Sequence, residues 1–158
     1  MKISTRSLLR MISYWPPFLA AGIKVENFRE DFTHIRVRLK SSFWNKNYFG
    51  THFGGSLFSM ADPFYLFILI EKLGDDHILW DKTSEIDFLK ATHETVYADF
   101  HISAKEIESI RKQALTKFKV IYTFYAEIKN ENGEVIAKIK KDLYIRRKDA
   151  KDRFSKIS

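Results

Sequence analysis

A run of seven consecutive apolar residues, Phe-Tyr-Leu-Phe-Ile-Leu-Ile at positions 64–70, constrains the fold more than any other feature of the sequence. It belongs to a predicted helix over residues 56–73, which Gly74 ends. A helix that is apolar on every side must be covered on nearly every side. The apolar segment is shorter than the roughly 20 residues of a membrane-spanning helix, and Asp62 and Pro63 precede it directly. We therefore expect a buried helix of a water-soluble protein, with no membrane partner.

Most of the other apolar residues recur with a period of two, which is typical of strands that bury one face. This pattern indicates strands over residues 23–28, 32–40, 78–88, 96–102, 118–128 and 135–145. Asn132-Gly133 predicts a tight hairpin turn between the last two strands, because both positions tolerate positive φ. We expect the third strand to be bent and to present four residues on one face: Ile78, Trp80, Ile86 and Phe88.

Two short helices complete the expected elements. Ser4 or Thr5 would cap a helix over residues 6–14, which the Pro16-Pro17 pair ends. Residues 104–115 have the spacing of a short amphipathic helix.

This order of elements is that of an antiparallel α+β protein, because a parallel sheet would require strands and helices to alternate regularly. A curved antiparallel sheet wrapped around the one long apolar helix would cover most of it, and a second subunit would cover the rest. We expect an amino-terminal helical segment over residues 1–22, a main domain over 23–148 and a charged, frayed tail over 149–158.

The composition excludes several classes of chemistry. The chain has 158 residues and no cysteine, which excludes disulfides, zinc–thiolate sites and cysteine nucleophiles and favours a cytoplasmic location. The five histidines lack metal-ligand spacing, and we expect neither a metal nor another cofactor. The sequence also lacks a Gly-Lys-Ser/Thr phosphate loop and a Gly-x-Ser-x-Gly elbow.

The net charge is +7, with 27 Lys and Arg against 20 Asp and Glu. Such a balance fits a phosphate-bearing ligand, an anionic surface or nucleic acid, and selects none of them. Many basic residues gather late in the chain, where we expect a solvated strand face and tail: Lys138, Lys140, Lys141, Arg146, Arg147, Lys148, Lys151, Arg153 and Lys156. Most aromatic residues occupy core phases instead of lying beside these cations, so we expect no nucleic-acid partner.

The candidate chemistry lies just before the apolar run. Gly54 and Gly55 stand at the start of the expected helix, where free backbone N–H groups can hold an anion or a developing oxyanion. Asp62 is the only charged residue between positions 56 and 70, and Pro63 disfavours helical geometry at Asp62. A lone carboxylate there is expensive to bury unless it has a partner or faces a cleft. Two interpretations stay open here: a structural hydrogen bond at a kink, or an active-site carboxylate.

This stretch resembles the hotdog-fold acyl-CoA thioesterases, especially the phenylacetate-degradation type. Asn47 corresponds to the asparagine of their motif, Gly54-Gly55 to the glycine pair, and Asp62 to the carboxylate on the central helix. Residues 84–91 are similar to the third strand of that family, and the resemblance covers residues 23–147.

A closer likeness is to a branch of uncharacterised hotdog proteins. The motifs shared with this branch are Pro16-Pro17, Gly-Thr-His-Phe-Gly-Gly-Ser over residues 50–56, Asp62-Pro63, and Trp-Asp-Lys over residues 80–82.

The resemblance implies a hotdog fold and thioester hydrolysis without a metal. Asp62 would be the nucleophile or the general base that orients water, and the Gly55 amide would polarise the thioester carbonyl. Asn47 would position water or substrate across a dimer interface.

The same resemblance implies substrate contacts by His52, Phe53 and Gly54, and Lys90 is a candidate for contact with the coenzyme A phosphates. We expect a homodimer or homotetramer.

One departure from the thioesterase motif keeps a second function open. In the thioesterases the histidine directly precedes the glycine pair, whereas here Phe53 occupies that position and His52 lies one residue earlier. The leading hypothesis is an acyl-CoA thioesterase, and the alternative is a non-catalytic hotdog protein that binds acyl-CoA or another acyl ligand.

Overall fold

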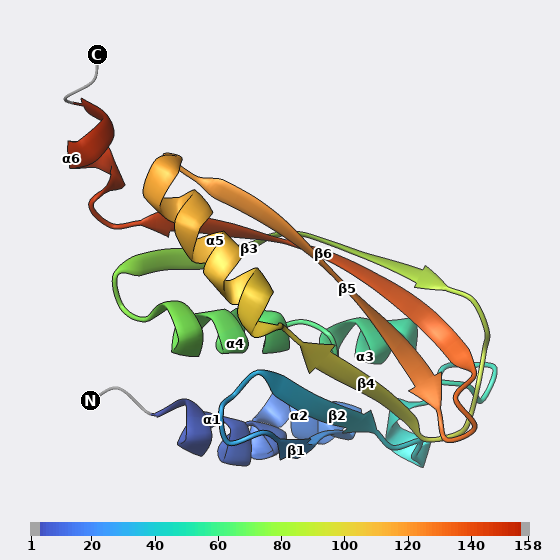
Figure 1. Cartoon of the computed structure of the whole chain (residues 1–158). Helices are drawn as coiled ribbons and strands as arrows, with labels where there is room; N and C mark the ends of the chain where they lie inside the picture. Colours follow the sequence, from blue (N-terminus) through green and yellow to red (C-terminus); the bar gives the residue numbers. More distant parts are fainter. Residues whose placement is uncertain (1–3, 156–158) are drawn as a thin grey trace.

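The computed structural model describes residues 4–155, so the outer ends of the two expected terminal segments, Lys156 included, lie outside the described residues. Its six strands form one antiparallel sheet in the order β1-β2-β4-β5-β6-β3, curved around the apolar helix (Figure 1). The strands are β1 Ile23–Phe28, β2 His34–Leu39, β3 His77–Phe88, β4 Val96–His101, β5 Val120–Asn130 and β6 Val135–Arg147. The expected α+β hotdog architecture is confirmed.

Between residues 4 and 155, six α-helices and two 3-10 helices accompany the sheet. They are α1 Thr5–Met11, η1 Ile12–Tyr14, α2 Pro16–Ala21, η2 Phe43–Asn45, α3 Gly54–Ser59, α4 Phe64–Leu73, α5 Ala104–Thr116 and α6 Ala150–Ser155. Within residues 4–155, no helix is long and apolar enough to cross a membrane.

The amino-terminal segment differs from expectation in one respect. Ser4 caps α1 as predicted, with its side chain accepting from the Ser7 N–H. The Pro16-Pro17 pair, however, also begins the additional helix α2, because the first turn of a helix needs no N–H donors and proline has the right φ. The charged tail likewise contains a helix, α6, where fraying was expected.

The predicted central helix is interrupted. α3 ends at Ser59 and α4 begins at Phe64, because Pro63 cannot donate the bond to the Ser59 carbonyl and disfavours helical geometry at Asp62. Asp62 therefore lies in the connection between two helices, not on a continuous helix.

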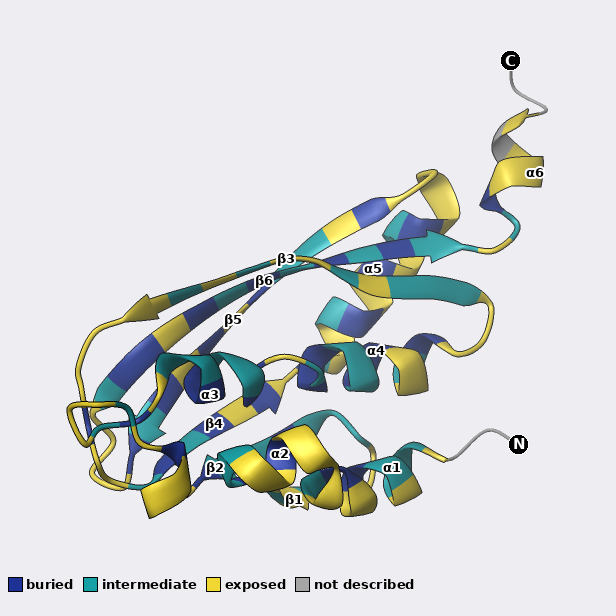
Figure 2. Ribbon diagram, turned by 180° about the vertical axis from the view of Figure 1, so that it is seen from behind, coloured by how far each residue is buried: buried dark blue, intermediate teal, exposed yellow. Residues whose placement is uncertain are grey.

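The core lies between the concave face of the sheet and the helices (Figure 2). Phe64, Ile68 and Leu69 of α4 are fully buried, and Phe64 stacks on Phe100 of β4 with ring centroids 5.2 Å apart. Ile70 remains exposed, so the sheet leaves one side of α4 uncovered, as the apolar run implied.

Strand β3 is an edge strand with a bulge. Its register against β6 shifts between Asp81 and Thr83, so the side chains change phase at this point. Leu79 and Ile86 pack against the core, while Trp80 is 46% exposed and stacks on Tyr144. The expectation that Trp80 and Ile86 share one face is therefore wrong, because the bulge inserts one residue between them.

Candidate active site

A buried lysine meets Asp62 at the break between α3 and α4. The Lys141 Nζ donates to Asp62 Oδ1 at 2.9 Å and also to the main-chain carbonyl of Asp62. The Lys141 side chain is 1% exposed, whereas that of Asp62 is 55% exposed. The carboxylate is thus held on its inner side and open to solvent on its outer side.

A second carboxylate faces the same ammonium group. Asp81 Oδ1 lies 3.1 Å from Lys141 Nζ, and the angles make this an ion pair without a good hydrogen bond. Burial raises the pKa of Asp81, the nearby Lys141 opposes this rise, and the charge of Asp62 adds to it. One buried cation therefore lies between two carboxylates of different exposure.

The solvated position expected for Lys141 is wrong. Lys141 has the same parity on β6 as the buried residues Ile139 and Leu143, so its side chain points toward the helices. This alternation is visible in the sequence, and it could have identified Lys141 as a residue on the core face of the strand. The phase of Asp81 could not be foreseen, because it depends on the bulge in β3.

The crevice beside Asp62 is narrow. Its lining comprises Phe58, Ala61, Asp62, Ser84, Ile139 and Lys141. It has no space for a water molecule, so a substrate would have to approach Asp62 from its exposed side.

The glycine pair lies in a separate groove of about 390 Å³ between α2, η2 and α3, which Gly55 lines. Phe53 is the N-cap residue of α3, and its ring lies so close that a Cβ on Gly55 would be 2.3 Å from Phe53 Cε1. A Cβ on Gly54 would be 3.1 Å from Phe88 Cζ at the end of β3. The structure therefore brings Phe53, Gly54 and Gly55 together.

Asn47 organises its own loop. Its side-chain amide donates to Thr51 Oγ1 at 2.8 Å, and its Oδ1 accepts from the backbone N–H groups of Phe49 and Thr51. Lys90 pairs with Glu134 at 2.5 Å on the surface. In this single chain neither residue contacts Asp62.

His52 is buried, and its Nε2 lies 2.6 Å from the Glu94 carbonyl. Because a carbonyl only accepts, we assign the ring proton to Nε2. Burial lowers the pKa of His52, and the charge of Lys46 acts in the same direction. Its Nδ1 has no hydrogen-bond partner among the described residues. The ring supports the loop through the Glu94 contact, and it does not line the Asp62 crevice.

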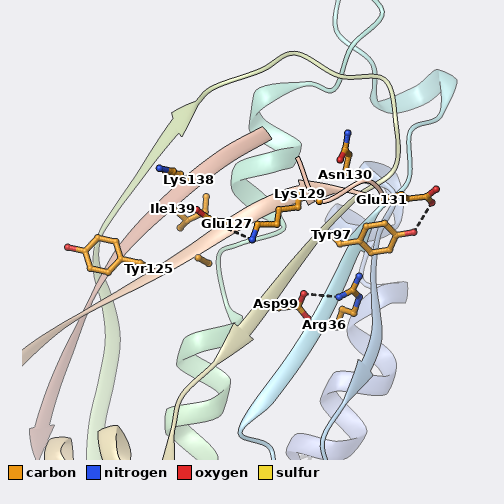
Figure 3. A pocket seen from close by; sticks show the side chains of 12 residues that line it. Arg36, Tyr97, Asp99, Tyr125, Glu127, Lys129, Asn130, Glu131, Lys138 and Ile139 are labelled. Atoms are coloured by element: carbon orange, nitrogen blue, oxygen red, sulfur yellow. Dashed lines mark hydrogen bonds and ion pairs between the residues drawn. The ribbon is translucent and has the colours of Figure 1, made fainter. Parts of the chain in front are cut away.

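A hollow of about 660 Å³ lies on the outer face of the sheet and contains none of the predicted site residues. Two ion pairs lie in it: Arg36 with Asp99 at 2.8 Å, and Lys129 with Glu127 at 2.8 Å (Figure 3). We do not assign the chemistry to this hollow, because none of the residues of the predicted site lines it.

Comparisons with known proteins agree on the architecture. The model of the family described as "Domain of unknown function (DUF4442)" matches residues 5–145. No curated protein matches the sequence.

Three solved structures illustrate the similarity. A Pseudomonas aeruginosa protein of unknown function, described as a probable thioesterase, is 20% identical, with 93% of this chain and 98% of that chain covered and a TM-score of 0.77. A Haemophilus influenzae thioesterase is 12% identical, with 93% of each chain covered and a TM-score of 0.66. A hypothetical thioesterase protein from Streptococcus pneumoniae, solved with coenzyme A, is 20% identical, with 87% of this chain and 97% of that chain covered and a TM-score of 0.57. At these identities the likeness establishes the fold.

Proposed function

The chain belongs to the DUF4442 family, and from this premise we propose that it is a thioesterase that hydrolyses acyl-CoA with Asp62 as its catalytic carboxylate. The observation that carries the proposal is the exposed Asp62 carboxylate, fixed from behind by the buried Lys141 at a break in the central helix. The thioesterase names of the structural neighbours support the same reaction class.

The proposed reaction needs only a carboxylate, water and an oxyanion donor. Asp62 takes a proton from water as the hydroxyl oxygen attacks the thioester carbonyl, and collapse of the tetrahedral intermediate breaks the carbon–sulfur bond. The proton returns to the departing sulfur, which leaves as the free thiol of coenzyme A. In the nucleophilic variant Asp62 attacks the thioester carbonyl directly, and the carbon–sulfur bond breaks to release the coenzyme A thiolate. Water then hydrolyses the resulting anhydride, which frees Asp62 and the acid, and the thiolate takes up the proton released.

The Gly55 amide is the proposed oxyanion donor, and its position calls for a second copy of the chain. Gly55 lies in the first turn of α3, whereas Asp62 lies beyond Ser59, the last residue of α3, at the opposite end of that helix. Amides in the first turn of a helix point toward its amino end, so the Gly55 N–H points away from Asp62. We propose that Asp62 of one copy and Gly55 of another complete each site in a homodimer, or in a homotetramer of two such dimers.

The edge of the sheet offers the contact for this second copy. β3 has 12 residues and, within residues 4–155, pairs only with β6; its residue Ser84 lines the Asp62 crevice. A long edge strand is a template for pairing with another chain. Pairing there would place the Asp62 crevice beside the interface.

The proposed substrate contacts follow from the same arrangement. Phe53 and Gly54 would contact the acyl thioester beside Gly55, and Lys90 would meet phosphate groups of coenzyme A by releasing Glu134. His52 would contribute by holding the loop that presents them. The coenzyme A in the streptococcal neighbour supports this ligand class.

The alternative is a non-catalytic acyl-ligand-binding protein. It is favoured by Phe53, whose ring lies against Gly55 where the thioesterases have a histidine. Turnover distinguishes the two functions, because both predict binding of acyl-CoA.

The test is free-thiol release from short, long and aromatic acyl-CoAs. We expect turnover by the wild type, loss on the order of a hundredfold or more in Asp62→Asn, and unchanged turnover in Asp152→Asn, a matched change at an exposed position of α6. Circular dichroism confirms that the variants fold. Binding of acyl-CoA without turnover of any substrate would establish the alternative, and an active Asp62→Asn enzyme would refute the proposed carboxylate.

A further inference from the structure

We infer that Lys141 is the positioning residue for Asp62, and that Asp81 acts behind it to tune how strongly the ammonium group attracts the Asp62 carboxylate. This inference rests on the proposed function, because it treats Asp62 as the catalytic carboxylate. Lys141 itself lies behind Asp62 at 1% exposure and would not touch the substrate.

The first argument is the cost of a charge at this position. Lys141 lies between Ile139 and Leu143 on the core face of β6, where an apolar side chain would pack without penalty. Burying an ammonium group is expensive unless ionic partners compensate. The charged groups that meet Lys141 are Asp62 and Asp81, so holding these carboxylates is what the buried cation accomplishes.

The second argument is that three departures from regular structure meet at this contact. The Pro63 break leaves the Asp62 carbonyl outside α4, whose first backbone bond runs from Phe67 N–H to the Pro63 carbonyl, and Lys141 takes up the free carbonyl. The bulge in β3 turns Asp81 toward the same ammonium group. The third departure is Lys141 itself. Such departures cluster at functional sites.

The third argument concerns charge balance. With both carboxylates ionised, the negative charge of Asp81 offsets part of the positive potential that Lys141 produces at Asp62. If Asp81 became neutral, this offset would be lost and the Asp62 carboxylate would be a weaker base. Burial raises the pKa of Asp81, which favours the neutral form of this second carboxylate.

These roles predict opposite effects for two variants. Lys141→Met removes the cation and leaves two neighbouring carboxylates, so kcat should fall on the order of tenfold to a hundredfold and the acid limb of the pH–rate profile should move to higher pH. Asp81→Asn removes the competing anion, so the acid limb should move to lower pH. A purely structural role would not move the limb in opposite directions.

The experiment records kcat, KM and pH–rate profiles of both variants with the best acyl-CoA. Lys140→Met is the matched control, because Lys140 is the adjacent residue on β6 and forms a surface pair with Glu85 at 3.2 Å. The same proteins, labelled with ¹³C at the aspartate carboxyl carbons, are titrated by NMR, with Asp62→Asn identifying the Asp62 signal. The titration midpoint of Asp62 should move up in Lys141→Met and down in Asp81→Asn.

The two readouts separate the possible failures. Unshifted Asp62 midpoints in both variants would overturn the inference even if the wild type is an active thioesterase. Shifted midpoints in a protein without turnover would uphold the electrostatic control of Asp62 and overturn the proposed function. If Lys141→Met does not fold, Asp81→Asn still decides whether Asp81 acts on Asp62, because an unshifted Asp62 midpoint in that variant would overturn this part of the inference.

Discussion

Buried polar side chains hold the loop that leads into α3. Asn45 donates to the carbonyl oxygens of Ala21 and Lys40 at 2.7 and 2.6 Å and accepts from the Ser42 N–H, which ties the loop to the ends of α2 and β2. His52 ties the same loop to the Glu94 carbonyl. An irregular loop buries backbone groups that no strand or helix satisfies, so these side chains supply the missing partners. The glycine pair therefore rests on residues that do no chemistry themselves.

His52→Gln tests this supporting role through pH. Burial lowers the folded-state pKa of His52 below its ordinary value of 6.5, so the unfolded chain binds more protons as the pH falls through 6.5. The stability that neutral His52 contributes is complete above this pH and is lost below it. We expect His52→Gln to be about 1 kcal/mol or more less stable at pH 7.5, and to lose less stability than wild type between pH 7.5 and 5.5.

Urea unfolding at the two pH values measures both effects. Burial also lowers the pKa of His77. Because His77 is present in both proteins, part of the pH dependence of stability will remain in His52→Gln. The exposed neighbour His93 provides the control, and His93→Gln should behave as wild type. An identical pH slope in His52→Gln and wild type would contradict the buried, neutral imidazole.

At the scale of elements, the sequence patterns located the strands and the apolar helix, because period two and the all-round apolar run both record burial directly. They did not locate the bulge in β3 or the helix α2, since a bulge depends on the partner strand and Pro16-Pro17 can end one helix while beginning another. Asp62 could be identified from the sequence because it is a lone charged residue in an apolar stretch and directly precedes a proline. Lys141 was missed because it was grouped with the neighbouring cations instead of being read by its parity.

At the start of α3, the effect of Gly55→Ala on stability should change sign when the Phe53 ring is removed. In wild type, Gly55→Ala should lower stability, because its Cβ would be 2.3 Å from the Phe53 ring and the ring must move away. In a Phe53→Ala background the same change should raise stability by up to about 1 kcal/mol, because alanine suits a helix better than glycine. Denaturant unfolding of the four proteins in this double-mutant cycle measures the coupling. Equal effects of Gly55→Ala in both backgrounds would show that Phe53 does not lie against Gly55 in solution.

At the scale of the whole molecule, the single chain leaves large apolar side chains uncovered in the same region as its incomplete proposed site. Phe88 and Leu89 are exposed at the end of β3, and Phe43, Trp44 and Phe53 are exposed on and after η2. Soluble monomers rarely expose so many large apolar groups together. A second copy that covers this region would also bring a Gly55 amide to each Asp62, so assembly and catalysis are expected to depend on each other.

Subunit complementation tests this dependence. Asp62→Asn removes the carboxylate. Gly55→Pro removes the amide donor and displaces the Phe53 ring of the same chain, since proline is tolerated in the first turn of a helix but its Cβ would lie 2.3 Å from that ring. Each variant alone should be inactive, but a heterodimer should contain one site with both wild-type groups. An equimolar mixture, unfolded and refolded together, should regain about a quarter of wild-type turnover, because half of the dimers are mixed and each carries one intact site of two. Sedimentation equilibrium should give a mass of twice 18.7 kDa, or of four chains, for every sample. A mixture that reassembles yet stays inactive would place Asp62 and its oxyanion donor within one chain, and a monomeric wild type with full turnover would exclude the shared site altogether.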